Sequence, residues 1–200
     1  ARARPGWQRR LPAARTGIAP RCAKTGDAMP DGSGRRAVFL DRDGVLNRDV
    51  GYVGSIDRFV LMDGAVAAVR RANDAGYRVF VATNQSGVAR GLFTEDDVQA
   101  LHAWLIDRFA QAGARIDAIR YCPHHPEGIV APYAGSCTCR KPAPGLLRDL
   151  LADYAIDPGV SLMVGDSERD LLAARAAGIP AHLFSGGDLD AFLAPLLAHG

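Results

Sequence analysis

The sequence has no long apolar run and few aromatic residues. No stretch approaches the roughly 18 consecutive apolar residues of a membrane-spanning helix. The basic amino-terminal segment has no apolar core, which argues against a secretory signal. Aromatic residues make up 7% of the chain, and no stripe of basic and aromatic residues of the kind that binds single-stranded nucleic acid is present. We therefore expect a cytoplasmic globular protein without a membrane or nucleic-acid partner.

Cysteine is also scarce. The 200 residues contain four cysteines, and three of them lie in the stretch YCPHHPEGIVAPYAGSCTCRKPAPG at 121–145, together with two of the five histidines. An odd number of cysteines beside histidines, in a chain without an export signal, argues against a disulfide framework. The pattern favours a metal site.

The net charge of +2 conceals two oppositely charged parts. Residues 1–36 carry nine Lys/Arg and two Asp, whereas the remainder carries fifteen Lys/Arg and twenty Asp/Glu. The first part has no sustained apolar period and many Pro, Gly and Arg residues, so we expect a disordered basic extension ahead of one domain at 37–200. Its composition also fits a transit peptide, and Met29 offers an alternative translation start. The acidic remainder gives little support for nucleic-acid binding.

Short apolar segments alternate with amphipathic segments from residue 37 onward. The strand-like segments are AVFL (37–40), RVFVAT (78–83), IDAIRY (116–121), SLMVG (161–165) and PAHLF (180–184). The helical patterns cover 64–75, 94–112, 168–177 and 188–197. Thr94 is the predicted N-cap of the second helix. This alternation predicts a doubly wound, Rossmann-like α/β fold, in which helices cover both faces of a parallel sheet.

Polar residues follow three of the predicted strands, at the edge of the sheet where ligands bind in such folds. Asp41 and Asp43 follow the first strand, Thr83 and Asn84 the second, and Asp166 the fourth. Each residue alone is typical of a turn or a helix cap. Together they place three carboxylates at one edge, where a divalent cation such as Mg²⁺ would relieve their repulsion.

The motifs DRDGV at 41–45, TN at 83–84, KP at 141–142 and GDSERD at 165–170, in this order, resemble those of the haloacid dehalogenase-like phosphohydrolases. The resemblance covers residues 37 to about 185. It implies a nucleophilic carboxylate, an aspartyl-phosphate intermediate and a catalytic Mg²⁺ ion that offsets the charge of the phosphate dianion.

The resemblance assigns a role to each carboxylate. Asp41 would be the nucleophile, and Asp43 would protonate the leaving oxygen and later activate water. Mg²⁺ would bind the side chains of Asp41 and Asp166 and the main-chain carbonyl of Asp43. Asp170 is either a supporting residue or a helix-surface acid, and the sequence leaves both interpretations open.

The remaining polar residues of the site would act on the phosphoryl group. Thr83 and Asn84 would donate hydrogen bonds to it, and Lys141 would offset its charge. Only 42 residues separate Asp41 from Thr83 and 58 separate Thr83 from Lys141, which leaves no room for the cap domain of many relatives. We expect an open, capless site whose specificity comes from short loops.

Within the family, the segments LDRDGVLNRDVGYV, TNQSGVARG with FTE after it, and YCPHHP…CTCRKPAPG resemble the D-glycero-D-manno-heptose 1,7-bisphosphate 7-phosphatases of the histidinol-phosphatase-like branch. The resemblance implies a phosphatase that acts on a small sugar bisphosphate in nucleotide-activated heptose and lipopolysaccharide biosynthesis. We expect a monomer. Ser167 stands where some relatives carry a bulkier or charged residue, and the sequence does not assign its contact.

The same resemblance predicts the substrate contacts. The segment 49–52 would contact the sugar, and Arg140 would bind the phosphate that is not cleaved, because its planar guanidinium can hold phosphate with two hydrogen bonds. A solvated Arg140 is the alternative. The full predicted set is Asp49, Val50, Gly51, Tyr52, Asn84, Gln85, Ser86 and Arg140.

The Cys/His stretch completes the resemblance. The predicted ligands of a tetrahedral Zn²⁺ ion are Cys122, His124, Cys137 and Cys139. His125 is an alternative to His124, and free, reduced cysteines are an alternative to the whole site. Four protein ligands leave no open position, so the zinc would be structural. Because Cys139 precedes Arg140 and Lys141, it would also fix the direction of these two cations.

Three other functions compete with this interpretation. Histidinol-phosphate phosphatase shares the motifs, but the twelve residues between His124 and Cys137 and the presence of Arg140 favour the heptose branch. The presence of both Asp41 and Asp43 argues against a catalytically silent zinc-binding module, and the acidic domain argues against a phosphatase of nucleic-acid ends. The remaining histidines are expected in ordinary helix or surface positions: His102, His182 and His199.

Overall fold

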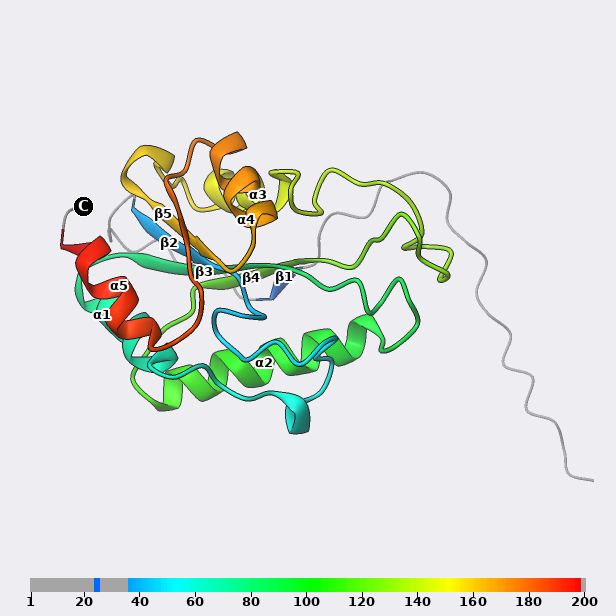
Figure 1. Cartoon of the computed structure of the whole chain (residues 1–200), viewed down its shortest axis with the longest axis horizontal. Helices are drawn as coiled ribbons and strands as arrows, with labels where there is room; N and C mark the ends of the chain where they lie inside the picture. Colours follow the sequence, from blue (N-terminus) through cyan, green and yellow to red (C-terminus); the bar gives the residue numbers. More distant parts are fainter. Residues whose placement is uncertain (1–23, 26–35, 199–200) are drawn as a thin grey trace, which may run out of the picture.

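A computed structural model of the chain describes residues 24–25 and 36–198 (Figure 1). One six-stranded sheet has the order β1-β4-β3-β2-β5-β6. Its parallel strands are β2 (Ala37–Leu40), β3 (Arg78–Asn84), β4 (Ala118–Cys122), β5 (Leu162–Gly165) and β6 (Ala181–Leu183). The short β1 (Lys24–Thr25) pairs with β4 in the antiparallel direction. The predicted doubly wound fold is confirmed, whereas the predicted disorder of residues 1–36 falls almost entirely outside the described residues.

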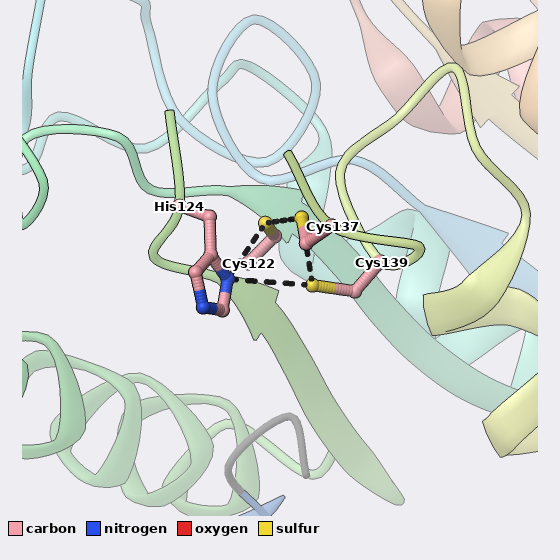
Figure 2. A group of neighbouring side chains, drawn as sticks. All are labelled: Cys122, His124, Cys137 and Cys139. Carbon is pink, nitrogen blue, oxygen red and sulfur yellow. Dashed lines mark hydrogen bonds between the residues drawn. The ribbon is translucent and has the colours of Figure 1, made fainter. Parts of the chain in front are cut away.

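The described residues form five α-helices: α1 (Ala65–Asp74), α2 (Glu95–Gln111), α3 (Gly145–Asp153), α4 (Glu168–Ala176) and α5 (Leu189–Leu197). Of these, α1, α2, α4 and α5 match the predicted helical patterns, whereas no pattern had been predicted for α3. Two short 3-10 helices, η1 (Ile56–Arg58) and η2 (Pro158–Val160), lie in the connections. The long loop between β4 and α3 brings Cys137 and Cys139 beside Cys122 at the end of β4 (Figure 2). This loop is therefore the segment that the Cys/His cluster can shape.

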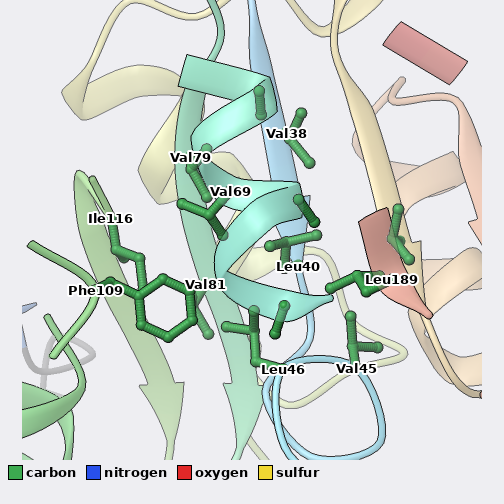
Figure 3. Close-up of a cluster of buried hydrophobic side chains, with 14 of the residues drawn as sticks. Val38, Leu40, Val45, Leu46, Val69, Val79, Val81, Phe109, Ile116 and Leu189 are labelled. Carbon is green, nitrogen blue, oxygen red and sulfur yellow. The ribbon is translucent and has the colours of Figure 1, made fainter. Parts of the chain in front are cut away.

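The apolar strands alternate their side chains between two cores. Val38 and Leu40 of β2 point toward α1, α2 and α5, where they pack with Val69, Phe109 and Leu189 (Figure 3). Ala37 and Phe39, the intervening residues of β2, belong to the core that α3 and α4 cover. Because helices cover both faces, every residue of β2 is buried, which explains a continuous apolar run instead of an alternating one.

The start of α2 confirms the predicted cap. The Thr94 hydroxyl accepts a hydrogen bond from the Asp97 amide at 3.1 Å, and the Asp97 carboxylate accepts one from the Thr94 amide at 2.7 Å. This reciprocal pair satisfies two amides that the helix cannot bond internally. The cap fixes where the chain turns from the carboxyl edge of the sheet into α2.

The connections are short at the edge where the site was predicted. Between β2 and β3 the chain forms η1 and α1, and between β3 and α3 it forms α2, β4 and the Cys/His loop. Within residues 36–198 there is no separate cap domain, as predicted. In that same part of the chain, no helix is both long enough and apolar enough to cross a membrane.

Candidate active site

A hollow of about 310 Å³ lies at the carboxyl edge of the sheet. It gathers residues from four segments that are far apart in the sequence. Ten of the predicted site residues line it: Asp41, Asp43, Asp49, Gly51, Tyr52, Thr83, Asn84, Gln85, Ser86 and Arg140. The predicted convergence of strand ends is therefore observed, although the roles of these residues stay predictions.

Lys141 occupies the base of the site in a fully buried position. Its Nζ atom lies 2.9 Å from Oδ2 of Asp41 and 2.6 Å from Oδ1 of Asp170, and it donates to the carbonyl of Ala82 at 2.7 Å. Burial opposes the charge of the ammonium, but the two carboxylates outweigh it and raise the pKa of Lys141. A buried lysine with two anionic partners stays charged, as a group that offsets phosphate must.

Asp41 lies in the same buried cluster. Burial raises its pKa to about 7, together with the nearby Asp170 and Asp43, while Lys141 opposes the rise. Its Oδ1 atom accepts a hydrogen bond from the Arg42 amide at 2.7 Å. A carboxylate in this position is partly desolvated, which suits a nucleophile.

Asp170 is buried and supports the site from the first turn of α4. Its Oδ2 atom accepts hydrogen bonds from the Ser167 hydroxyl at 2.7 Å and the Ser167 amide at 3.1 Å. Although burial opposes it, the charge of Lys141 holds the pKa of Asp170 below its usual range. Asp170 is thus not a helix-surface acid, and Ser167 is part of a capping pair.

Three carboxylates could hold a metal ion. Oxygen atoms of Asp41, Asp166 and Asp170 all lie within 4.8 Å of one another. The Oδ1 atom of Asp166 is buried without a hydrogen-bond partner, and burial together with Asp170 raises the pKa of Asp166. A Cβ atom on Gly44 would lie only 2.0 Å from Asp166 Oδ2, and the φ angle of Gly44 is +83°, so glycine is required there. The unpaired buried oxygen and the all-oxygen donor set fit Mg²⁺.

Asp43 has a separate set of partners. Its carboxylate accepts hydrogen bonds from Arg42 Nη2 at 3.0 Å, Gln85 Nε2 at 2.8 Å and Asn47 Nδ2 at 2.9 Å. Gln85 Nε2 also donates to the Thr83 hydroxyl at 3.0 Å. Two carboxylates that are two residues apart therefore have different environments, which is typical of residues with different roles.

Sequence reasoning did not assign Arg42 and Asn47, two of the three residues that bond Asp43. Arg42 is fully buried, and its Nη1 atom lies 3.1 Å from Nε2 of His102 on α2. Burial and the charge of Arg42 lower the pKa of His102 well below its ordinary value, so the ring is neutral and accepts. The expectation of an ordinary helix or surface position was wrong for His102, because a sequence pattern does not show what lies opposite a buried helix residue. His182 is half-buried on β6, and His199 lies outside the described residues.

Asn84 bonds the main chain of Lys141. Its side-chain Nδ2 donates to the Lys141 carbonyl at 3.0 Å, and its Oδ1 accepts from the Lys141 amide at 3.1 Å. The side chain thus ties the end of β3 to the segment before α3 and positions Lys141. A direct contact of Asn84 with substrate stays a prediction.

The Cys/His cluster has the geometry of a tetrahedral metal site. The Sγ atom of Cys137 lies 3.5 Å from that of Cys122 and 3.4 Å from that of Cys139, and the His124 Nδ1 atom lies 3.7 and 3.6 Å from Cys122 and Cys139 (Figure 2). Ligands of tetrahedral zinc lie about 3.5–3.8 Å apart at ordinary bond lengths. No disulfide joins the three cysteines of the described residues to one another. Of the two candidate histidines, His124 meets the thiols.

Comparison with known proteins decides the family. Residues 7–178 match the profile of the haloacid dehalogenase-like hydrolases. The chain is 52% identical over 163 residues to D-glycero-beta-D-manno-heptose-1,7-bisphosphate 7-phosphatase from Rhodopseudomonas palustris, a match that covers 82% of this chain and 91% of the relative. The chain belongs to the haloacid dehalogenase-like hydrolase family. Relatives of this similarity are named as phosphatases, which confirms the predicted enzyme class, a phosphoric monoester hydrolase.

Further relatives of the family share this similarity. The D-glycero-alpha-D-manno-heptose-1,7-bisphosphate 7-phosphatase of Burkholderia mallei is 45% identical and covers 72% of this chain and 76% of the relative. The crystal structure of D,D-heptose 1,7-bisphosphate phosphatase from B. bronchiseptica, complexed with magnesium and phosphate, has a TM-score of 0.69 and 40% identity. It covers 80% of this chain and 86% of that chain.

Arg140 joins the Cys/His loop to the hollow. Its amide donates to Cys137 Sγ at 3.4 Å, and its Nη1 atom donates to the His124 carbonyl at 3.3 Å. Burial, with the neighbouring charges of Arg169 and Arg90, lowers the pKa of Arg140. The side chain is thus half-buried and held by the loop.

Three more basic residues line the hollow, and none of them was assigned to the substrate site from the sequence. They are Arg90, His125 and Arg169. Arg90 Nη2 lies 3.2 Å from His125 Nε2, and Arg169 belongs to the first turn of α4. Each of the three lies in a segment that gave a signal: Arg90 in the TNQSGVARG motif, His125 beside the predicted zinc ligand His124, and Arg169 in the GDSERD motif.

The predicted sugar-contacting segment forms a loop at the rim of the hollow, here called the 49–52 loop. Arg58 of η1 holds it, because its Nη2 atom donates to the carbonyls of Gly51 at 2.9 Å and Val50 at 3.2 Å. Tyr52 has a φ angle of +49°, a strained conformation for a residue that carries a side chain. Tyr52 is 47% exposed, which leaves its ring free to contact a ligand.

Proposed function

We propose that this chain is a Mg²⁺-dependent phosphatase that removes the 7-phosphate of D-glycero-D-manno-heptose 1,7-bisphosphate through an aspartyl phosphate on Asp41. One observation carries the proposal: the hollow combines a buried carboxylate–lysine cluster with a separate group of three arginines. The first suits phosphoryl transfer, and the second suits a phosphate that stays on the sugar. The named relatives act on this bisphosphate.

The chain's own residues would carry out two displacements. In the first, Asp41 attacks the phosphorus, the bond to the sugar oxygen breaks, and Asp43 gives that oxygen a proton. In the second, Asp43, now a carboxylate, takes a proton from a water molecule that attacks the phosphorus and frees Asp41. Thr83 would donate a hydrogen bond to the phosphoryl group, and Lys141 would offset its charge throughout.

The side chains of Asp41 and Asp166 would hold Mg²⁺, together with the main-chain carbonyl of Asp43. When bound, the ion neutralises the repulsion between the nucleophile and the phosphate dianion. Asp170 is tied to Lys141 and Ser167, so we assign it to positioning the lysine. A structural Zn²⁺ ion on Cys122, His124, Cys137 and Cys139 is part of the same proposal.

The number of arginines that line the hollow favours a substrate with two phosphates over histidinol phosphate, which has one. A substrate with one phosphate needs one phosphate-binding centre, which Asp41 and Lys141 provide. Arg90, Arg140 and Arg169 bring three guanidiniums to the hollow, although Arg90 also lies 3.8 Å from the carboxylate of Glu127. Burial lowers the pKa of Arg140, and the charges of Arg169 and Arg90 add to this effect, which favours a second phosphate as the partner of these arginines. A place in nucleotide-activated heptose synthesis, a cytoplasmic location and a monomeric state stay predictions.

The test is phosphate release in the presence of Mg²⁺ from three substrates: the alpha and beta anomers of the heptose bisphosphate, and histidinol phosphate. The proposal predicts the highest kcat/KM for one of the two bisphosphate anomers. Both anomers are included because the relatives carry names for both. Faster turnover of histidinol phosphate would overturn the proposal.

A further inference from the structure

Phe93 lies between two glycines that belong to different loops of the active site. A Cβ atom added at Gly54 would lie 2.2 Å from the ring atom Cδ1 of Phe93, and one added at Gly87 would lie 2.2 Å from its Cζ. Neither glycine has a φ angle in the left-handed region, so the backbone conformation does not require glycine there. Contact with the ring explains both glycines.

The two glycines belong to the segments that line the hollow from different strands. Gly54 follows the 49–52 loop by two residues, and Gly87 follows Gln85 and Ser86. The Gly87 carbonyl accepts a hydrogen bond from the Leu92 amide at 2.9 Å, so the turn after β3 closes on itself directly beside the ring. The position of the ring therefore limits how closely the two segments approach each other.

The residues after Phe93 hold the ring in place. Thr94 caps α2, and Glu95 in the first turn of that helix accepts hydrogen bonds from the hydroxyl groups of Tyr121 at 3.1 Å and Tyr133 at 2.7 Å. Tyr121 belongs to β4 and Tyr133 to the Cys/His loop. The FTE segment that follows the TNQSGVARG motif is thus tied to β4 and to the Cys/His loop.

We propose that Phe93 is a specificity-determining residue: by separating Gly54 from Gly87, it sets the width of the hollow to that of a sugar with two phosphates. This inference rests on the proposed function. Phe93 does not touch the reacting carboxylates, so it is a positioning residue. A substrate that reaches only Asp41 and Asp43 depends little on this width, whereas a substrate that spans the hollow depends on it.

The test compares kcat/KM for heptose bisphosphate and for p-nitrophenyl phosphate in Gly54→Ala, Phe93→Ala and the double variant. Each single change is expected to lower kcat/KM for the bisphosphate about tenfold, because small displacements of positioning groups carry costs of this order. Turnover of p-nitrophenyl phosphate should stay within about twofold, since the catalytic carboxylates are untouched. In the Phe93→Ala background, Gly54→Ala should cost nothing further, because the added methyl group then meets empty space.

Leu92→Ala is the matched control. Leu92 precedes Phe93 and is 57% exposed, and its side chain is not among the atoms nearest to either glycine. The control should retain the wild-type ratio of the two substrates. Thermal denaturation shows whether each variant is folded, and Phe93→Leu replaces Phe93→Ala if the latter is not.

Two failures can be told apart. If the wild-type protein does not prefer the bisphosphate to p-nitrophenyl phosphate, the proposed function fails and this inference fails with it. If the wild-type protein prefers the bisphosphate and the Phe93 variants keep that preference, only the role of Phe93 is refuted. Equal losses for both substrates would also refute it, because they indicate general damage to the fold.

Discussion

The ammonium group of Lys141 lies 2.9 Å from the carboxylate of Asp41, and both side chains are buried. The same ammonium lies 2.6 Å from Asp170. The charge of one ammonium group therefore balances two carboxylates in a buried place, where little water is present to solvate them. We therefore predict that stability and phosphoryl transfer both depend on Lys141.

Replacement of Lys141 by methionine is predicted to damage both properties. The change leaves Asp41 and Asp170 buried without their cation, a loss that costs about 3–5 kcal/mol of the free energy of unfolding for buried pairs. It also removes a charge that stabilises the transition state, for which a loss of about a hundredfold in kcat is expected. Urea denaturation and phosphate release measure the two effects.

The control for this change is Lys141→Met combined with Asp170→Asn. The double variant removes one of the two uncompensated carboxylates, so it should recover part of the stability but none of the activity. Recovery of activity would show that Lys141 acts only through the fold.

Zinc is predicted to support substrate binding through Arg140. Cys139→Ser removes one thiolate from the cluster that the Arg140 amide contacts through Cys137. We expect the variant to lose zinc, to unfold at a lower temperature and to show a raised KM for the bisphosphate, with a smaller change in kcat. Cys22→Ser, outside the described residues, should behave as the wild type.

Metal analysis of the wild-type protein, purified without added zinc, provides the other arm of that test. One zinc ion per chain is expected. A content well under one ion per chain, in active protein, would refute the structural zinc site.

His102 is predicted to make stability fall on acidification. Burial and Arg42 lower its folded-state pKa well below the ordinary 6.5, so the folded state binds fewer protons than the unfolded state in this range. The stabilisation is fully present above pH 6.5 and is lost as the pH falls below it, by up to about 1.4 kcal/mol per pH unit. Urea denaturation between about pH 7.5 and 5.5 measures it.

His102→Gln is the comparison for that profile, because glutamine retains an acceptor for Arg42 but does not titrate. The difference in stability between the wild-type protein and this variant should shrink as the pH falls. Parallel curves would contradict a neutral His102. The rings of His102 and Tyr121 are in contact, and burial raises the pKa of the Tyr121 hydroxyl, so Tyr121 stays neutral in this range.

The positions of the strands and of most site residues were predictable because they depend on local pattern and topology. AVFL forms a strand that is buried on both faces, and such a strand has a continuous apolar sequence that is easily recognised. Parallel strands end at the same edge of the sheet, so Asp41, Thr83 and Asp166 meet there whatever the details of packing. The grouping of Cys122, His124, Cys137 and Cys139 was predictable from their spacing and from the resemblance to the family.

What the sequence did not reveal depends on contacts across the fold. Arg42 and His102 are 60 residues apart, and nothing local marks them as partners. From its position in the predicted helix, Asp170 was equally compatible with an exposed site. It is buried because α4 packs so that its carboxylate meets Lys141. Phe93 appeared in a motif without a role, because the close approach of its ring to Gly54 and Gly87 involves residues without side chains, which leave no pattern in the sequence.

The central claim is that Asp41 forms a covalent phosphoenzyme. The most direct measurement is mass spectrometry of enzyme that is quenched in acid during turnover of the bisphosphate. The account predicts one phosphate on the peptide that contains Asp41, and neither phosphate nor turnover in Asp41→Asn. Substantial phosphatase activity in Asp41→Asn, or a phosphate bound to another residue, would contradict it.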